Sequence, residues 1–192
     1  MADEPDPALA PEPVLAPDAP LRQRPDERIG CYPGSFDPMT VAHLAVAEAA
    51  LEAASLDRID LVLSIDALGK GHLGPGTVQA RRHALEAVAA RHPWLGVRVT
   101  TARLVADIAE GYDAVVMGAD KWRQVVDPAW YGDDPAARDA AVARLPRVLV
   151  APRGDDEPDD VELLDVDPAH RHVRATDVRA GHDHAERWRL DP

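Results

Sequence analysis

Short apolar segments alternate with longer helix-forming segments along most of this chain. Two of the apolar segments, residues 113–118 and 147–151, are almost wholly apolar, which is typical of strands that are covered on both faces. Strands of this kind separated by helices predict a parallel sheet with right-handed crossovers. We therefore predict an α/β fold with a doubly wound, mostly parallel sheet of five or six strands.

The globular part is expected to begin near residue 27. Residues 1–26 hold seven of the 18 prolines and show no apolar period, so we expect a disordered tail rich in Ala, Pro and acidic residues, followed by one domain over residues 27–192. Strands are predicted at 28–32, 58–65, 96–101, 113–118, 147–151 and, at an edge, 160–166. Helices are predicted at 41–55, 78–92 and 135–145, with Leu44, Ala47 and Leu51 as the inward stripe of the first.

Bulk composition narrows the class of protein. The formal net charge of -13 argues against a general affinity for nucleic acid or an anionic membrane, because both need a basic face. No run approaches the ~20 apolar residues of a membrane helix, and the acidic N-terminus does not resemble a signal peptide. Cys31 is the single cysteine, so no internal disulfide is expected and a reducing, cytoplasmic location is the natural interpretation. We expect its thiol to be a small core group.

The segment 34–43, GSFDPMTVAH, directly follows the first predicted strand. Ligands of doubly wound sheets bind beyond the carboxyl ends of the strands. Gly34 allows the backbone to approach a ligand closely, and Thr40 is a good N-cap that places His43 in the first turn of the next helix. The unpaired first-turn N–H groups and the helix dipole favour an anion there. The segment therefore predicts a phosphate site.

This segment resembles the first signature of the nucleotidylyltransferase superfamily, G-[ST]-F-D-P-x-[HT]-x-G-H. Residues 118–122 (GADKW) and 147–156 (RVLVAPRGDD) resemble segments of nicotinate and nicotinamide mononucleotide adenylyltransferases, and 174–181 (RATDVRAG) resembles the second signature, I-S-S-T-x-[IV]-R. The resemblance implies a Rossmann-like nucleotidylyltransferase fold. It also implies transfer of a nucleotidyl group, AMP from ATP, to a small phosphorylated acceptor such as a nicotinate or nicotinamide mononucleotide, with release of pyrophosphate.

The resemblance further implies roles for individual residues. His43 and Thr40 would contact the α-phosphate, and Lys70, in the loop after the second strand, would reach the phosphates of either substrate. Arg179 would bind the β- and γ-phosphates together with Thr176, in a stretch rich in arginine. Gly34, Ser35, Phe36, Gly118 and Asp120 complete the implied nucleotide-binding set. Mg²⁺ would bridge phosphate oxygens and keep most of its waters, so no dedicated set of protein ligands is expected.

Four positions depart from the two signatures, namely Thr40, Ala42, Arg174 and Ala175. They leave three alternatives open: a pantetheine-phosphate adenylyltransferase, a cytidylyltransferase using CTP, and a nucleotide-binding paralogue without turnover. The sequence also leaves open whether the chain forms a homo-oligomer.

Several residues near the signatures have plainer interpretations beside the functional ones. Asp120 fits the cap of a helix that begins at Lys121, and Trp122 and Trp130 fit hydrophobic packing as well as a wall against a substrate. Asp37 is expected to fix its loop through backbone hydrogen bonds.

Overall fold

The computed structural model describes residues 22–66, 73–182 and 184–190. Its single six-stranded sheet is wholly parallel, in the order β3-β2-β1-β4-β5-β6. The strands are β1 (Ile29–Pro33), β2 (Arg58–Ser64), β3 (Leu95–Thr100), β4 (Ala114–Gly118), β5 (Arg147–Ala151) and β6 (Glu162–Leu163). The predicted doubly wound parallel sheet is confirmed, including the short strand at the edge. The strand order reverses between β1 and β4, which is where ligands bind in this architecture.

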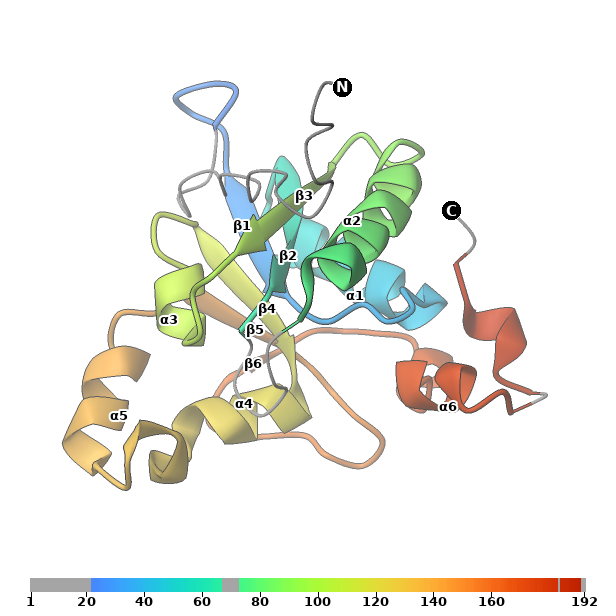
Figure 1. Ribbon diagram of the computed structural model, residues 1–192. Coiled ribbons are helices and arrows are strands. Elements are labelled where there is room, and N and C mark those ends of the chain that lie inside the picture. The colour runs from blue at the N-terminus through green and yellow to red at the C-terminus, as the bar shows by residue number, and fades with distance from the viewer. Residues whose placement is uncertain (1–21, 67–72, 183, 191–192) are drawn as a thin grey trace, which may run out of the picture.

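Helices cover both faces of the sheet (Figure 1). One face packs against α1 (Val41–Ala53) and α2 (Pro75–Ala89), and the other against α3 (Val105–Ile108), α4 (Ala119–Val126) and α5 (Pro135–Val142). The remaining helical segments are η2 (Pro128–Tyr131), η3 (Pro168–His170), α6 (Ala175–Arg179) and η4 (Glu186–Trp188).

The residues of β4 show why this central strand is apolar along its whole length. Ala114 and Val116 belong to the core under α1 and α2, whereas Val115 and Met117 belong to the core under α3 and α4. Successive side chains of a strand point to opposite faces, so a strand covered on both sides needs apolar residues without alternation. Cys31 is fully buried in the second core, as expected. Burial, with a smaller effect of Asp60, raises the pKa of its thiol well above the usual value.

Two helices differ from the sequence-based expectation. The predicted start of α2 at residue 78 is wrong: the helix begins at Pro75 with Gly74 as its N-cap, because Pro suits the first helical position. On α1 the buried residues are Ala42, Val46, Ala47 and Ala50, and Leu44 and Leu51 are only partly buried. The small side chains of the alanines allow α1 to lie close to the sheet.

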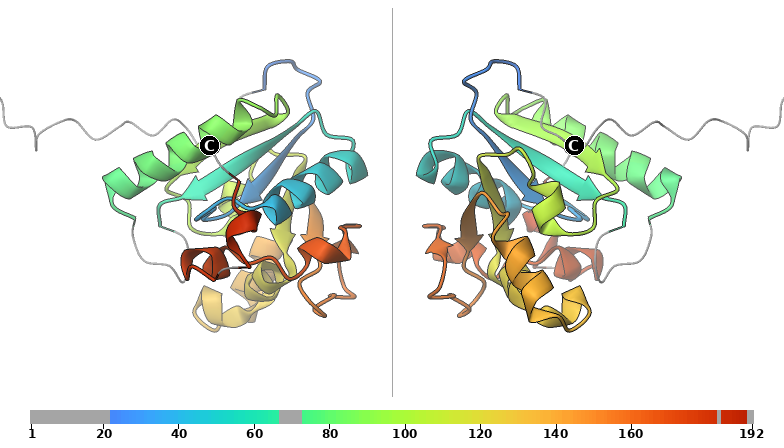
Figure 2. Two further views of the ribbon diagram at one scale, coloured as in Figure 1. Left: turned by 90° about the vertical axis from the view of Figure 1, so that its right-hand side faces the viewer. Right: turned by 90° about the vertical axis from the view of Figure 1, so that its left-hand side faces the viewer.

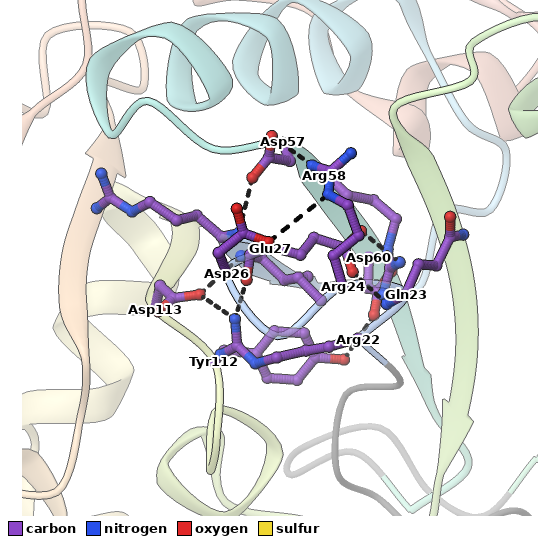
Figure 3. Close-up of polar contacts among 12 residues, drawn as sticks. Arg22, Gln23, Arg24, Asp26, Glu27, Asp57, Arg58, Asp60, Tyr112 and Asp113 are labelled. Atoms are coloured by element: carbon purple, nitrogen blue, oxygen red, sulfur yellow. Dashed lines mark hydrogen bonds and ion pairs between the residues drawn. The ribbon is translucent and has the colours of Figure 1, made fainter.

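Polar side chains form a network at the amino ends of β1, β2 and β4, opposite the carboxyl ends at which ligands bind (Figure 3). Arg58 bonds Glu27 and the buried Asp60, each at 2.9 Å, and the hydroxyl of Tyr112 donates to Asp60 at 3.0 Å. Each of these polar side chains thus has a hydrogen-bonding partner within the network, which is the condition under which charged groups are tolerated in a protein interior. This network fixes the amino ends of the central strands and leaves their carboxyl ends for a ligand.

Both chain ends described by the structure lie against the domain. Within the predicted tail, residues 1–21 fall outside the described residues, but Arg22 donates to Asp113 at 2.9 Å (Figure 3). At the other end, the N–H of Leu190 donates to the carbonyl of Met39 at 3.1 Å, so the C-terminal segment lies beside the start of α1 (Figure 2). Within the described ranges, no helix combines the length and apolar character needed to cross a bilayer.

Candidate active site

Thr40 and His43 form a capping box at the start of α1, directly above the switch point between β1 and β4. The backbone N–H of Thr40 donates to Nδ1 of His43 at 3.0 Å. Because Nδ1 accepts this bond, the proton of the neutral ring is assigned to Nε2. The predicted cap and first-turn histidine are confirmed, and the cap also sets which ring nitrogen can donate.

Aromatic rings hold the imidazole in place. The ring of Phe36 packs edge-on against His43 with centroids 5.3 Å apart, and Tyr32 lies 6.2 Å away. Phe36 in turn requires Gly34, because a Cβ at that position would lie 2.6 Å from the phenyl ring. The glycine of the signature therefore serves the packing of Phe36, and the phenylalanine serves the orientation of His43.

One pocket, here called the β1–β4 pocket, opens beside His43. Its described lining includes Thr40 and Ala42 of the first signature, the ends of β4 and β5, and the basic side chains Arg153 and Arg171. The lining residues are Tyr32, Thr40, Ala42, His43, Val46, Gly118, Ala151, Pro152, Arg153, Val166, His170, Arg171 and Val173. Burial raises the pKa of Tyr32, with a lowering effect of Arg153 and a raising effect of Asp120, so its phenol remains neutral.

A second pocket, here called the β1–β2 pocket, lies on the other side of the loop between β1 and α1. Its lining is Pro33, Gly34, Ser35, Ser64, Leu73, Arg81, Arg103, Val105, Ile108 and Lys121. A shallower depression shares Arg103, Val105 and Lys121 with it and extends to Trp130, whose side chain is among the exposed large apolar groups. Neither pocket has an Asp or Glu among its described lining residues, although the chain carries a net charge of -13. Both therefore suit anionic ligands.

Asp37 lies in the loop between β1 and α1 and contacts two arginines from distant segments. Its Oδ2 lies 2.6 Å from Nη2 of Arg81 on α2 and 3.7 Å from Nη1 of Arg179 on α6. Nη1 of Arg179 also donates to the backbone carbonyl of Asp37. The expectation that Asp37 acts through backbone hydrogen bonds is wrong, since its carboxylate binds side chains. Arg179 does reach the first signature, as its predicted role requires.

The other predicted site residues are placed as follows. Gly118 ends β4 and is the N-cap of α4, so the expectation that Asp120 caps a helix beginning at Lys121 is wrong. Asp120 is exposed in the first turn of α4, and Thr176 is exposed on α6; neither lines the two pockets. Lys70 lies outside the described residues, so its predicted role stays a prediction.

Several residues that line the pockets were assigned no role from the sequence. Arg81, Arg103, Arg153 and Lys121 come from four different segments and meet only through the sheet topology. Trp122, for which a wall against a substrate was the alternative, is buried and donates to Asp160 at 3.1 Å, so it is a packing residue. A usable signal existed for the arginines, since each stands in or after a segment that leaves the carboxyl end of a strand.

The sequence relationships agree with this geometry. A family model described as cytidylyltransferase-like matches residues 31–180, from β1 to the residue after α6. The chain belongs to the cytidylyltransferase-like family. A curated relative from Ruegeria pomeroyi, described as a probable nicotinate-nucleotide adenylyltransferase, is 33% identical over 149 residues. That match covers 63% of this chain and 68% of the relative.

Solved structures of Plasmodium falciparum nicotinic acid mononucleotide adenylyltransferase share the fold of this cytidylyltransferase-like chain. The complex with NaAD superposes with a TM-score of 0.60 at 14% identity, covering 80% of this chain and 83% of that one. The complex with APC gives a TM-score of 0.60 at 12% identity, covering 84% and 90%. At such low identity the likeness shows the fold.

Proposed function

We propose that this chain transfers the adenylyl group of ATP to nicotinate mononucleotide and releases pyrophosphate. The observation that carries the proposal is the capping box, which fixes the imidazole of His43 at the N-terminus of α1 with its donor nitrogen defined. A phosphate oxygen of the acceptor would form a bond to the α-phosphorus of ATP as the bond to the pyrophosphate oxygen breaks. The nucleophile is already an anion, so positioning and charge stabilisation suffice.

The two pockets suit the two substrates. The triphosphate would lie over the β1–β4 pocket, where Nε2 of His43 would donate to the α-phosphate as charge develops. Arg179 is not among the described lining residues but contacts Asp37 in the loop before α1, and from there it would hold the β- and γ-phosphates. The acceptor would occupy the β1–β2 pocket, whose cations suit a mononucleotide phosphate. The exposed ring of Trp130 in the adjoining depression offers a stacking surface for the cationic pyridinium ring of the mononucleotide, and Arg103 in the same lining suits the carboxylate on that ring. The name of the Ruegeria relative supports nicotinate as that pyridine.

Mg²⁺ is proposed to enter with the triphosphate. The described residues include no group of three or more His, Cys, Asp or Glu side chains that could hold a metal ion. We therefore propose that phosphate oxygens and water provide its ligands, as Mg²⁺ prefers. The ion would offset the charge of the triphosphate, and the residues named above would orient the reacting groups. A cytoplasmic location is proposed on the basis of the single, unpaired cysteine.

The test is release of pyrophosphate with Mg²⁺ in a matrix of nucleotides and acceptors. ATP and CTP are each combined with nicotinate mononucleotide, nicotinamide mononucleotide and phosphopantetheine. We expect the highest kcat/KM for ATP with nicotinate mononucleotide. A higher value with CTP or with phosphopantetheine would overturn the substrate assignment, and binding of ATP without pyrophosphate release for any acceptor would identify a paralogue without turnover.

A further inference from the structure

Asp37 connects two basic side chains that come from distant segments of the chain, Arg81 on α2 and Arg179 on α6. Arg81 is 18% exposed and lies 2.6 Å from the carboxylate, so this pair is the tighter and better shielded one. Arg179 is 45% exposed and meets the same Oδ2 at 3.7 Å, while its Nη1 donates to the Asp37 carbonyl. Arg81 therefore anchors the carboxylate, and the anchored carboxylate and its carbonyl hold Arg179.

A guanidinium that the protein already holds in one orientation contributes more to binding affinity than a mobile guanidinium does. An arginine side chain has many rotamers, and less affinity is lost when the side chain is already ordered before the ligand arrives. The guanidinium has five N–H donors, and Asp37 engages only one edge of it through Nη1. The remaining donors can bind phosphate oxygens while the contact with Asp37 persists.

We propose that Asp37 is a positioning residue that orients Arg179 toward the β- and γ-phosphates, with Arg81 as its anchor. The inference rests on the proposed function, because it assumes that a triphosphate lies over α1. It assigns a role to the aspartate of the first signature that involves no contact with the substrate. It also implies that a negatively charged side chain close to the site strengthens the binding of a negatively charged ligand.

The decisive variant is Asp37→Asn, which removes the charge and keeps the backbone carbonyl. We expect it to weaken ATP binding on the order of 10-fold, within the range for loss of one charge-assisted hydrogen bond. Binding of AMP, which lacks the β- and γ-phosphates, should change by less than about 2-fold. A role limited to folding of the loop would weaken both nucleotides alike. Calorimetric titration with ATP, and with AMP as its competitor, measures both affinities.

A double-mutant cycle tests whether Asp37 acts through Arg179. In an Arg179→Lys background, Asp37→Asn should change ATP affinity by less than about 2-fold, because the group that it positions is already gone. Glu86→Gln is the matched control: Glu86 pairs with Arg82 at 2.7 Å on the exposed side of α2 and lines neither pocket. If Asp37→Asn does not fold, Asp37→Glu replaces it in the cycle, since this variant keeps the charge but moves it by one methylene.

Three outcomes would overturn the inference. Unchanged or stronger ATP binding in Asp37→Asn would show that the carboxylate only repels the nucleotide. Equal weakening of ATP binding and AMP binding would indicate a structural role. If the double variant loses ATP affinity by the product of the two single losses, Asp37 and Arg179 act independently. These measurements need only nucleotide binding. Absence of pyrophosphate release would therefore refute the proposed function, and the double-mutant cycle could still be interpreted.

Discussion

Two different replacements of His43 can separate the two functions of its imidazole ring. Its Nδ1 accepts the backbone N–H of Thr40 at 3.0 Å, and its Nε2 carries the ring proton that would be donated to a phosphate. His43→Ala removes both. His43→Gln restores the first, because a glutamine at this position accepts the same N–H in a standard capping box, but its amide does not reproduce the imidazole Nε2–H.

The two losses differ in size and in the assay that detects them. Thr40 is 1% exposed, so its N–H without a partner should cost about 1–3 kcal/mol, or a fall in Tm of roughly 2–12 °C. Loss of a donor to the developing charge should lower kcat on the order of 10²- to 10³-fold, about 2.7–4 kcal/mol. We therefore expect a low Tm and a low kcat for His43→Ala, and a nearly normal Tm with a low kcat for His43→Gln.

Thermal unfolding and steady-state pyrophosphate release provide the two readouts. ATP affinity should fall much less than kcat in both variants, since the bond strengthens as charge develops. A His43→Gln variant that recovers kcat together with Tm would refute the reasoning, because it would reduce His43 to a helix cap. A rise in KM at unchanged kcat would limit His43 to ground-state binding.

Two further predictions concern ion pairs at opposite ends of the sheet. Arg179→Lys should weaken ATP binding roughly 10- to 150-fold and leave AMP unchanged, because lysine cannot make bidentate phosphate contacts; equal effects on both nucleotides in calorimetry would contradict this assignment. Burial raises the pKa of Asp113. The hydrogen bond from the N–H of Ile29 and the hydrogen bond and charge of Arg22 together have a larger effect, so the net result is a lowered pKa. The resulting stability is present above the unfolded-state pKa and is lost as pH falls through the folded-state pKa. Arg22→Gln should therefore reduce the free energy of unfolding in urea by about 1 kcal/mol or less at pH 7, and the difference from wild type should become smaller in acid, where only the bonds of Arg22 to the carbonyls of Glu27 and Gly111 remain; a difference that is constant with pH would refute the link.

The sheet was predictable because some of its strands, β4 above all, are apolar without interruption. Val115, Val116 and Met117 are buried on two faces, and this double burial appears in the sequence as an unbroken apolar run. The location of the site followed from the same fact, since a parallel sheet brings the carboxyl ends of its strands together. Helix boundaries were harder to predict. The helix α2 begins at Pro75 because proline suits the first helical position, and the spacing of apolar residues does not indicate such a start.

The ion pairs around the site could not be predicted in the same way. Asp37 and Arg81 are 44 residues apart, and Asp37 and Arg179 are 142 apart. No helical or strand period relates such positions, and a charged residue has the same sequence signal whether it lies in water or in a pocket. The local pairing of Thr40 with His43 could therefore be predicted from the sequence, together with a phosphate site at this helix end, whereas the contacts of Asp37 with Arg81 and Arg179 could not, because only the topology brings these residues together.

The balance of charge explains how so acidic a chain can suit two anionic substrates. A net charge of -13 would repel a triphosphate at long range, but mobile ions screen such repulsion beyond a Debye length of about 8–10 Å. Inside that distance the lining matters more than the total, and the described linings of both pockets contain cations and no carboxylate. Asp37 stands just outside these linings and is paired with Arg81. Its charge is thus neutralised locally, so it can hold Arg179 without presenting a full negative charge to the phosphates.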